Sequence, residues 1–288
     1  MTPDDKLAAI LAAVQVDPGG RGLARDPADN LFTATAGDFQ AACRVLAKKA
    51  VANILTGFYI PTAEPPAFET DGPLGAVFLV RALSWAGGHG SDIGFELPVF
   101  RAIRAGLAAV KHTEPLTRWL SPHLICIERA GPATDGNYYT MRGRDIGSHL
   151  DPWSKASLGR LLPNDVSIGI GDGGNEIGMG KVPHETIVKN IPNGDLVHCQ
   201  VPTDHLIVAG VSNWGAYALA AGVFVLRGRK PPADLFDPDR ELEILEVMVR
   251  EGPLVDGVTG RQTATVDGLT WDEYARPLVR IREILEAP

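Results

Sequence analysis

A chain of 288 residues with a formal net charge of −8 has the composition of an ordinary globular protein and lacks the basic face that nucleic-acid binding requires. Its most apolar stretch, residues 206–226, is interrupted by Ser212-Asn213-Trp214 and by glycines, so we expect no membrane span. Three cysteines without paired spacing argue against a disulfide framework or a zinc site. The N-terminus lacks a signal-peptide pattern, so we expect a cytoplasmic protein.

The pattern of apolar residues predicts one α/β domain over residues 1–288, in which residues 239–288 could form a small helical subregion. In chain order, helices are expected at residues 3–16, 39–49, 73–85, 98–111, 215–226, 241–251 and 271–286. Strands are expected at residues 51–58, 123–127 and 206–210, with a further strand that begins at Val166. The recurring order of strand, glycine-rich loop and helix predicts a layered fold with a mostly parallel sheet and flanking helices.

The strand that begins at Val166 leads into a loop with an unusual number of glycines, Gly171-Asp-Gly-Gly-Asn-Glu-Ile-Gly-Met-Gly180. Glycine has no Cβ, so such a loop can adopt left-handed backbone conformations and can let another group approach closely. Asp172, Asn175 and Glu176 are the side chains in this loop that can do chemistry. A purely structural turn rarely combines so many glycines with carboxylates, and we therefore interpret the loop as functional.

Acidic side chains follow several of the expected strands. These residues, with the one amide that shares the pattern, are Glu69, Asp71, Glu128, Asp135, Asp172, Glu176 and Asn213. Ligands of parallel sheets bind outside the carboxyl ends of the strands. The sequence therefore predicts one acidic crevice at that edge of the sheet.

Several carboxylates in one crevice need a source of positive charge. Two unit charges 4 Å apart repel by about 4 kcal/mol at an effective dielectric near 20. Protonation, the nearby Arg129, Arg142 and Arg144, or a bound cation could relieve this repulsion. Oxygen ligands without His or Cys favour a hard divalent cation, of which we expect Mg²⁺ or Mn²⁺. The candidate ligands are Glu69, Asp71, Asp135, Asp145, Asp172 and Glu176. Alternatively, some of these acids are solvated helix caps.

Other motifs are weaker. Gly169, Gly171 and Gly174 match the spacing of a dinucleotide fingerprint, but Asp172 stands where a pyrophosphate would approach, so we expect no nucleotide. No Gly-x-Ser-x-Gly nucleophile motif occurs.

A few further side chains could contact a ligand. Arg21, on a glycine-flanked loop, could reach an anionic group, and Tyr138 could stack on a ligand or hydrogen-bond to it. His149 and His184 lie near the acidic loops and remain alternative acid–base groups.

Four stretches of the chain resemble the D-glutamate cyclase family, and within it the domain that forms the C-terminal part of the vertebrate mitochondrial enzyme. They are Glu69-Thr-Asp-Gly-Pro-Leu-Gly-Ala, the segment from Glu128-Arg-Ala-Gly-Pro to Asp135-Gly-Asn-Tyr-Tyr-Thr-Met-Arg-Gly-Arg-Asp-Ile, Ile168-Gly-Ile-Gly-Asp-Gly-Gly-Asn-Glu-Ile-Gly-Met-Gly-Lys-Val, and Ala209-Gly-Val-Ser-Asn-Trp-Gly-Ala-Tyr-Ala-Leu. The resemblance covers roughly residues 15–265 and implies a lyase that reversibly removes water from D-glutamate to give 5-oxo-D-proline.

That reaction requires a base for the ammonium group, an acid or cation at the γ-carboxylate and an anchor for the α-carboxylate. We assign Glu128 or Glu176 as the base, Arg142 as the anchor and Asn213 as an oxyanion donor. The full catalytic set is Glu128, Asp172, Glu176 and Asn213, and the substrate-binding set is Arg142, Asn175, Tyr138 and Arg21.

Two alternatives from other classes stay open. The same acidic crevice could serve a metal-dependent hydrolase such as a phosphatase, or a module that binds a small polar metabolite without turnover. In each case the partner is a small molecule, and a homo-oligomer remains open.

Overall fold

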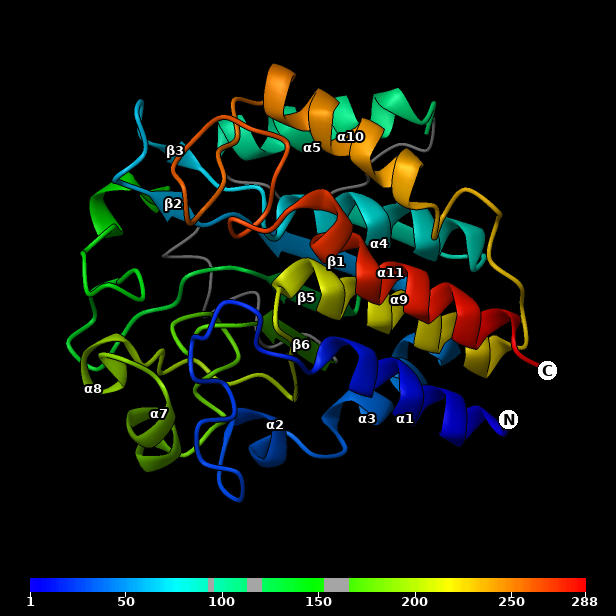
Figure 1. The fold of residues 1–288 in the computed structure, drawn as a ribbon, viewed down its shortest axis with the longest axis horizontal. Helices are drawn as coiled ribbons and strands as arrows, with labels where there is room; N and C mark the ends of the chain where they lie inside the picture. The colour runs from blue at the N-terminus through cyan, green and yellow to red at the C-terminus, as the bar shows by residue number, and fades with distance from the viewer. Residues whose placement is uncertain (93–95, 113–120, 153–165) are drawn as a thin grey trace.

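The computed structural model describes residues 1–92, 96–112, 121–152 and 166–288. Within these residues a five-stranded parallel sheet has the order β4-β1-β5-β6-β7 (Figure 1). Its strands are β1 (Val51–Thr56), β4 (His89–Asp92), β5 (His123–Ile127), β6 (Val166–Gly171) and β7 (His205–Val208). A short antiparallel pair, β2 (Tyr59–Ile60) and β3 (Ala67–Phe68), precedes the first long crossover helix. The predicted α/β fold with a mostly parallel sheet is confirmed.

All the expected helices are present, with ends within a few residues of the prediction. They are α1 (Pro3–Val14), α3 (Asp38–Lys48), α4 (Pro73–Trp85), α5 (Leu97–Ala109), α9 (Ser212–Arg227), α10 (Pro238–Glu251) and α11 (Trp271–Glu286). The short helices α2 (Leu31–Ala34), α7 (His184–Asn190) and α8 (Gly194–Val197) were not expected, because so few turns leave little apolar periodicity. Strand β4 was also missed, since its sequence around Gly88 and Gly90 is typical of a turn.

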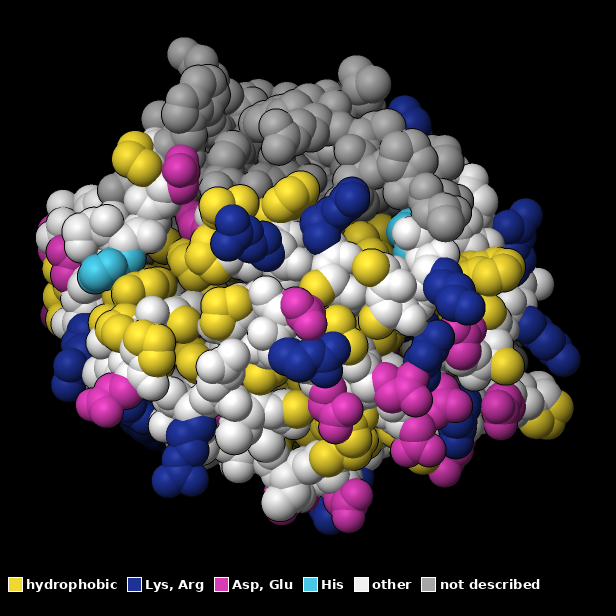
Figure 2. All heavy atoms as spheres, turned by 90° about the horizontal axis from the view of Figure 1, so that it is seen from above, with side chains coloured by type: hydrophobic (Ala, Val, Ile, Leu, Met, Phe, Trp, Pro, Cys, Tyr) yellow, Lys and Arg dark blue, Asp and Glu magenta, His cyan; other side chains and the backbone are white. Residues whose placement is uncertain are grey.

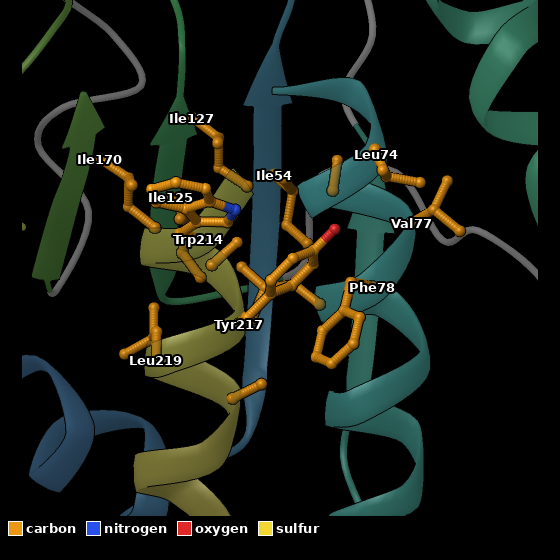
Figure 3. Packing of buried hydrophobic residues seen from close by; sticks show 14 of the residues in the cluster. Ile54, Leu74, Val77, Phe78, Ile125, Ile127, Ile170, Trp214, Tyr217 and Leu219 are labelled. Carbon is orange, nitrogen blue, oxygen red and sulfur yellow. The ribbon is translucent and has the colours of Figure 1, made fainter. Parts of the chain in front are cut away.

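One face of the sheet packs against α4 and α9. Ile125 and Ile127 of β5 point toward these helices, while the alternate residues Leu124 and Cys126 point to the other face, as the two-residue period of a strand requires. Figure 3 shows isoleucines of β1, β5 and β6 next to aromatic side chains of the two helices. These aromatic residues are Phe78 of α4 and Trp214 and Tyr217 of α9. Helices α1, α3 and α11 pack around α9 (Figure 1), and α10 packs on α5.

The chain that follows β6 packs on the second face of the sheet, together with Leu23 and Leu31 of the N-terminal segment. Ile177 joins the cluster of Leu124 and Cys126, and Met179 joins that of Leu206 and Val208 of β7. Because both faces are buried, the central strand β5 is apolar from Leu124 to Ile127, and Glu128 and Asp172 follow the ends of β5 and β6.

No helix among the described residues combines the length and apolar character that a membrane span needs. On the described part of the face seen in Figure 2, acidic and basic side chains are intermixed. The described part of this face therefore offers no continuous basic surface for a phosphate backbone.

Candidate active site

A cavity of about 280 Å³, here called the pocket, opens at the carboxyl ends of β5 and β6. Its acidic side chains are Glu69, Asp71, Glu128, Asp172 and Asp267, and its basic side chains are Arg21, Arg142 and Arg144. Glu128 is the first residue after β5 and Asp172 the first after β6, the edge at which parallel sheets bind ligands. Asn175, a predicted substrate-binding residue, also lines the pocket.

Glu128 is held in an uncommon conformation, with a φ of 42° in the left-handed region. Its amide donates to the carbonyl oxygen of Ile170 in β6 at 3.0 Å, and its carboxylate Oε2 accepts a 2.6 Å hydrogen bond from the Ser212 hydroxyl. Burial, and then the neighbouring carboxylates of Asp172 and Glu176, raise the pKa of Glu128 well above its usual value. A carboxyl group with a raised pKa can take up a proton and later release it.

The glycine loop, residues 172–181, folds around the carboxylate of Glu176. That carboxylate accepts hydrogen bonds from the backbone amides of Asp172 at 3.1 Å and Gly174 at 2.8 Å. The loop then returns over β6, where a Cβ on Gly178 (φ 111°) would lie 3.0 Å from the Cα of Gly169. Both oxygens of Glu176 are therefore used to shape the loop, and Glu176 is not among the residues that line the pocket.

Arg21 joins three segments of the chain at the pocket. Its Nη1 lies 3.0 Å from Asp172 and donates to the carbonyl oxygen of Gly210, while its Nη2 lies 2.8 Å from Asp267. Burial alone would lower the pKa of Arg21, but Asp172 and Asp267 raise it. The carboxylate of Asp17 accepts from the Arg21 amide and fixes this loop. The Arg21 guanidinium already bridges two carboxylates, so its first role is to balance charge.

Asp71 and Asn213 cap each other's helices. The Asn213 side-chain oxygen accepts from the amides of Gly72 at 2.9 Å and Gly75 at 2.7 Å, at the start of α4. In return, the Asp71 carboxylate accepts from the amides of Ser212 at 2.9 Å and Asn213 at 2.8 Å, at the start of α9. Asn213 does not line the pocket. This geometry gives Asn213 a capping role, and the oxyanion role stays an untested prediction.

Sequence reasoning missed Asp267, which reaches the pocket from the loop between α10 and α11. This loop is organised by the buried carboxylate of Asp256, which accepts hydrogen bonds from three backbone amides within it. At Gly257 the loop passes so close to Glu69 that a Cβ would lie 1.8 Å from the Oε2 of Glu69. Two Asp-Gly pairs, at residues 256–257 and 267–268, are the signal that the sequence offers for this loop.

Arg142 and Arg144 stand at the exposed rim of the pocket, on a tight turn in which the amide of Thr140 donates to the carbonyl oxygen of Arg144 at 2.9 Å. In the described part of the chain neither guanidinium forms an ion pair, so both can meet an anionic ligand. Arg129, the third arginine considered as a counter-charge, instead forms a buried two-bond ion pair with Glu96, at 2.8 and 2.7 Å.

Besides Glu176 and Asn213, three further predicted site residues lie outside the pocket. Asp135 is exposed, and its carboxylate accepts a 2.6 Å hydrogen bond from the Tyr139 hydroxyl. Asp145 is exposed and accepts from the amide of Gly147 at 2.8 Å. The half-buried Tyr138 packs against the main core. The structure therefore does not bring Asp135, Asp145 or Tyr138 to the other candidates, because each lies on the outer part of the same loop.

The two histidines considered as acid–base groups also lie elsewhere. The ring of His149 stacks on Tyr59 with centroids 4.3 Å apart. His184 is hydrogen-bonded to His198 at 2.9 Å between their Nδ1 atoms, and its Nε2 lies 3.2 Å from Asp195. Neither His149 nor His184 lines the pocket.

The buried acids form two groups that could hold a metal ion. Within each group the ligand atoms lie within 4.8 Å of one another, and the groups are Asp71, Asp172 and Asp267, and Glu128, Asp172 and Glu176. Burial, followed by the charge of Asp267, raises the pKa of Asp71 to about 7, and burial also raises that of Glu69. An oxygen-only donor set fits a hard divalent cation, although Arg21 and protonation already relieve part of the repulsion.

Comparison with known proteins places the chain. A family model described as D-glutamate cyclase-like, C-terminal, matches residues 10–282. The mitochondrial D-glutamate cyclase of Homo sapiens is 33% identical over 254 residues, which cover 78% of this chain and 40% of the human protein. The chain thus spans less than half the length of this relative. Because the human protein is mitochondrial, the cytoplasmic location expected for this chain stays a prediction. On these two matches, the chain belongs to the D-glutamate cyclase-like, C-terminal family.

Proposed function

We propose that the pocket catalyses the reversible dehydration of D-glutamate to 5-oxo-D-proline. The observation that carries this proposal is the charge arrangement of the pocket, in a chain that belongs to this family. Acids such as Glu128 and Asp172 lie at its buried end, while Arg142 and Arg144 stand at its rim without an ion pair to any residue that the structure describes. D-Glutamate has the matching polarity, because it carries an ammonium group at one position and carboxylates on either side of it.

This arrangement orients the substrate. The ammonium group enters among the buried carboxylates, where hydrogen-bond acceptors prevail, and the α-carboxylate meets Arg142 or Arg144. The γ-carboxyl group then lies beside the nitrogen, as ring closure requires. The side-chain amide of Asn175 donates to the carbonyl oxygen of Tyr139 at 2.7 Å, which leaves its oxygen as another acceptor at the pocket wall.

Glu128 is the proposed base and acid. It removes a proton from the ammonium group, and the free amine attacks the γ-carboxyl carbon to form the C–N bond. Cleavage of a C–O bond then releases water. The two protons that the nitrogen loses are the two that the departing oxygen gains, so one carboxyl group with a raised pKa can carry them in turn.

A divalent cation is a second part of the proposal. The residues that would hold it are Asp71, Asp172 and Asp267, which all line the pocket, and when bound it would polarise the γ-carboxyl group. The oxygen donor set supports Mg²⁺ or Mn²⁺.

A product assay tests both parts. The protein is incubated with D-glutamate or L-glutamate, with and without a chelator, and 5-oxo-proline is separated by chiral chromatography. We expect 5-oxo-D-proline from D-glutamate and a loss of most turnover after chelation, restored by Mg²⁺ or Mn²⁺. Turnover that is insensitive to chelation would remove the cation from the proposal. Release of phosphate from phosphoesters without any 5-oxo-proline would replace the proposal by a hydrolase.

A further inference from the structure

We infer that Ser212 is a positioning residue for Glu128, an inference that rests on the proposed function. Ser212 is the first residue of α9 and is fully buried. Its hydroxyl donates to Oε2 of Glu128 at 2.6 Å, a distance typical of a strong hydrogen bond to a carboxylate. No other described residue donates a hydrogen bond to the Glu128 carboxylate.

Helix capping does not account for the serine. The N-cap residue of α9 is Val211, which makes no side-chain cap bond. The amides at this end of the helix are satisfied instead by Asp71, which accepts from Ser212 and Asn213. The hydroxyl of Ser212 therefore does not cap the helix, and it donates its hydrogen bond to Glu128 instead.

The surroundings of Glu128 make a fixed orientation necessary. Its left-handed backbone, with φ 42°, is uncommon for a residue with a long side chain. On one side Gly72 packs so closely that a Cβ there would lie 2.8 Å from the Cβ of Glu128. With Oε2 held by Ser212, the oxygen left for the substrate is Oε1. A carboxyl group fixed in this way presents the same oxygen to the ammonium group in each turnover.

Three variants test the inference through steady-state kinetics with D-glutamate and a melting temperature for each. In Ser212→Ala the hydroxyl is removed without adding bulk, and we expect kcat to fall by about tenfold or more, with KM within about twofold. In Ser212→Thr the hydroxyl is kept, and we expect most of the lost kcat to return. Where the added methyl group prevents folding of Ser212→Thr, Ser212→Cys replaces it and should give an intermediate kcat.

Ser167→Ala is the matched control. The Ser167 hydroxyl donates to the carboxylate of Asp204 at 2.7 Å, a bond of the same kind at the amino end of β6, away from the pocket. This variant should lose stability and keep its kcat.

The outcomes separate the two claims. Product from the parent protein together with an unchanged kcat in Ser212→Ala would overturn the positioning role alone. So would a folded Ser212→Thr whose kcat stays as low as that of Ser212→Ala. Absence of 5-oxo-D-proline from the parent protein would overturn the proposed function and this inference with it.

Discussion

At the scale of single residues, the pocket separates the charges that hold the protein together from those left for a ligand. Inside the protein, Arg21 forms ion pairs with both Asp172 and Asp267. Arg142 and Arg144 instead remain unpaired within the described structure and exposed at the rim. The paired charges build the pocket, and the unpaired ones are those expected to contact substrate.

Replacing Arg142 by Ala should therefore weaken substrate binding. A charge-assisted hydrogen bond contributes about 1.5–3 kcal/mol, so we expect KM for D-glutamate to rise roughly tenfold or more while kcat changes little. Arg240→Ala, which removes an exposed guanidinium paired with Glu243 on α10, should leave both constants unchanged. Steady-state kinetics checks this, and a lower kcat at constant KM would assign Arg142 to the chemical step instead.

The sequence predicted part of this residue set. Glu128, Asp172 and Asn175 follow directly from the rule that ligands bind at the carboxyl ends of parallel strands. Asp135 and Asp145 obey the same rule in sequence, but their loop extends away from the sheet and exposes them. How far a loop returns to its strand depends on tertiary contacts that local sequence does not encode.

At the scale of elements, two helices begin at the pocket and depend on each other. Asn213 of α9 caps α4, and Asp71, which precedes α4, caps α9. This reciprocal capping cannot be inferred from sequence. The amide of Asn213 and the Asp71 carboxylate that accepts its hydrogen bond are 142 residues apart in the chain. The helices themselves were predictable from apolar spacing and from Pro73 in the first turn of α4.

Asn213→Ala should destabilise the protein without abolishing the chemistry. It removes the side-chain acceptor of the buried Gly75 amide, at a cost of about 1–3 kcal/mol, while the amide of Gly72 keeps its bond to the Asp71 carboxylate. Thr270→Ala, which removes the exposed cap of α11, should cost only about 1 kcal/mol.

Denaturant unfolding and kcat of the folded protein decide between the two roles of Asn213. If Asn213 acts only as a helix cap, kcat of the folded Asn213→Ala protein should fall by less than about tenfold. An oxyanion donor predicts a loss of about 10²–10³-fold with little change in stability, and that result would contradict the capping role.

At the scale of the whole molecule, buried acids make stability depend on pH. Burial is the main cause that raises the pKa of both Asp71 in the pocket and Glu241 of α10 to about 7. The folded protein then binds more protons than the unfolded chain between about pH 4 and 7. Their contribution to the free energy of unfolding is present at low pH and is lost as pH rises through about 7.

We therefore expect a lower melting temperature at about pH 8 than at about pH 6. Glu241→Gln should flatten this dependence, because it removes a titrating group that lies outside the pocket. Thermal melts of the parent and variant at both pH values provide the test. A melting temperature that rises with pH in the parent would contradict the assignment.

A divalent cation should have a second effect on the melting temperature, which the same thermal melts can measure. Metal ligands must be ionised, so Mg²⁺ or Mn²⁺ should raise the melting temperature more at about pH 8 than at about pH 6. Glu241→Gln should keep this cation effect. Equal melting temperatures with and without cation at both pH values would indicate that the pocket acids are balanced by Arg21 and protons alone.

The central claim is that the buried carboxyl group of Glu128 moves the protons of the reaction, and one comparison of kcat tests it most directly. Glu128→Gln keeps the size of the side chain but cannot carry a proton, and Glu246→Gln makes the same exchange at an exposed position of α10. We predict that formation of 5-oxo-D-proline falls by about 10²–10⁴-fold in Glu128→Gln and is unchanged in Glu246→Gln. A folded Glu128→Gln protein that converts D-glutamate at the parent rate would contradict the account.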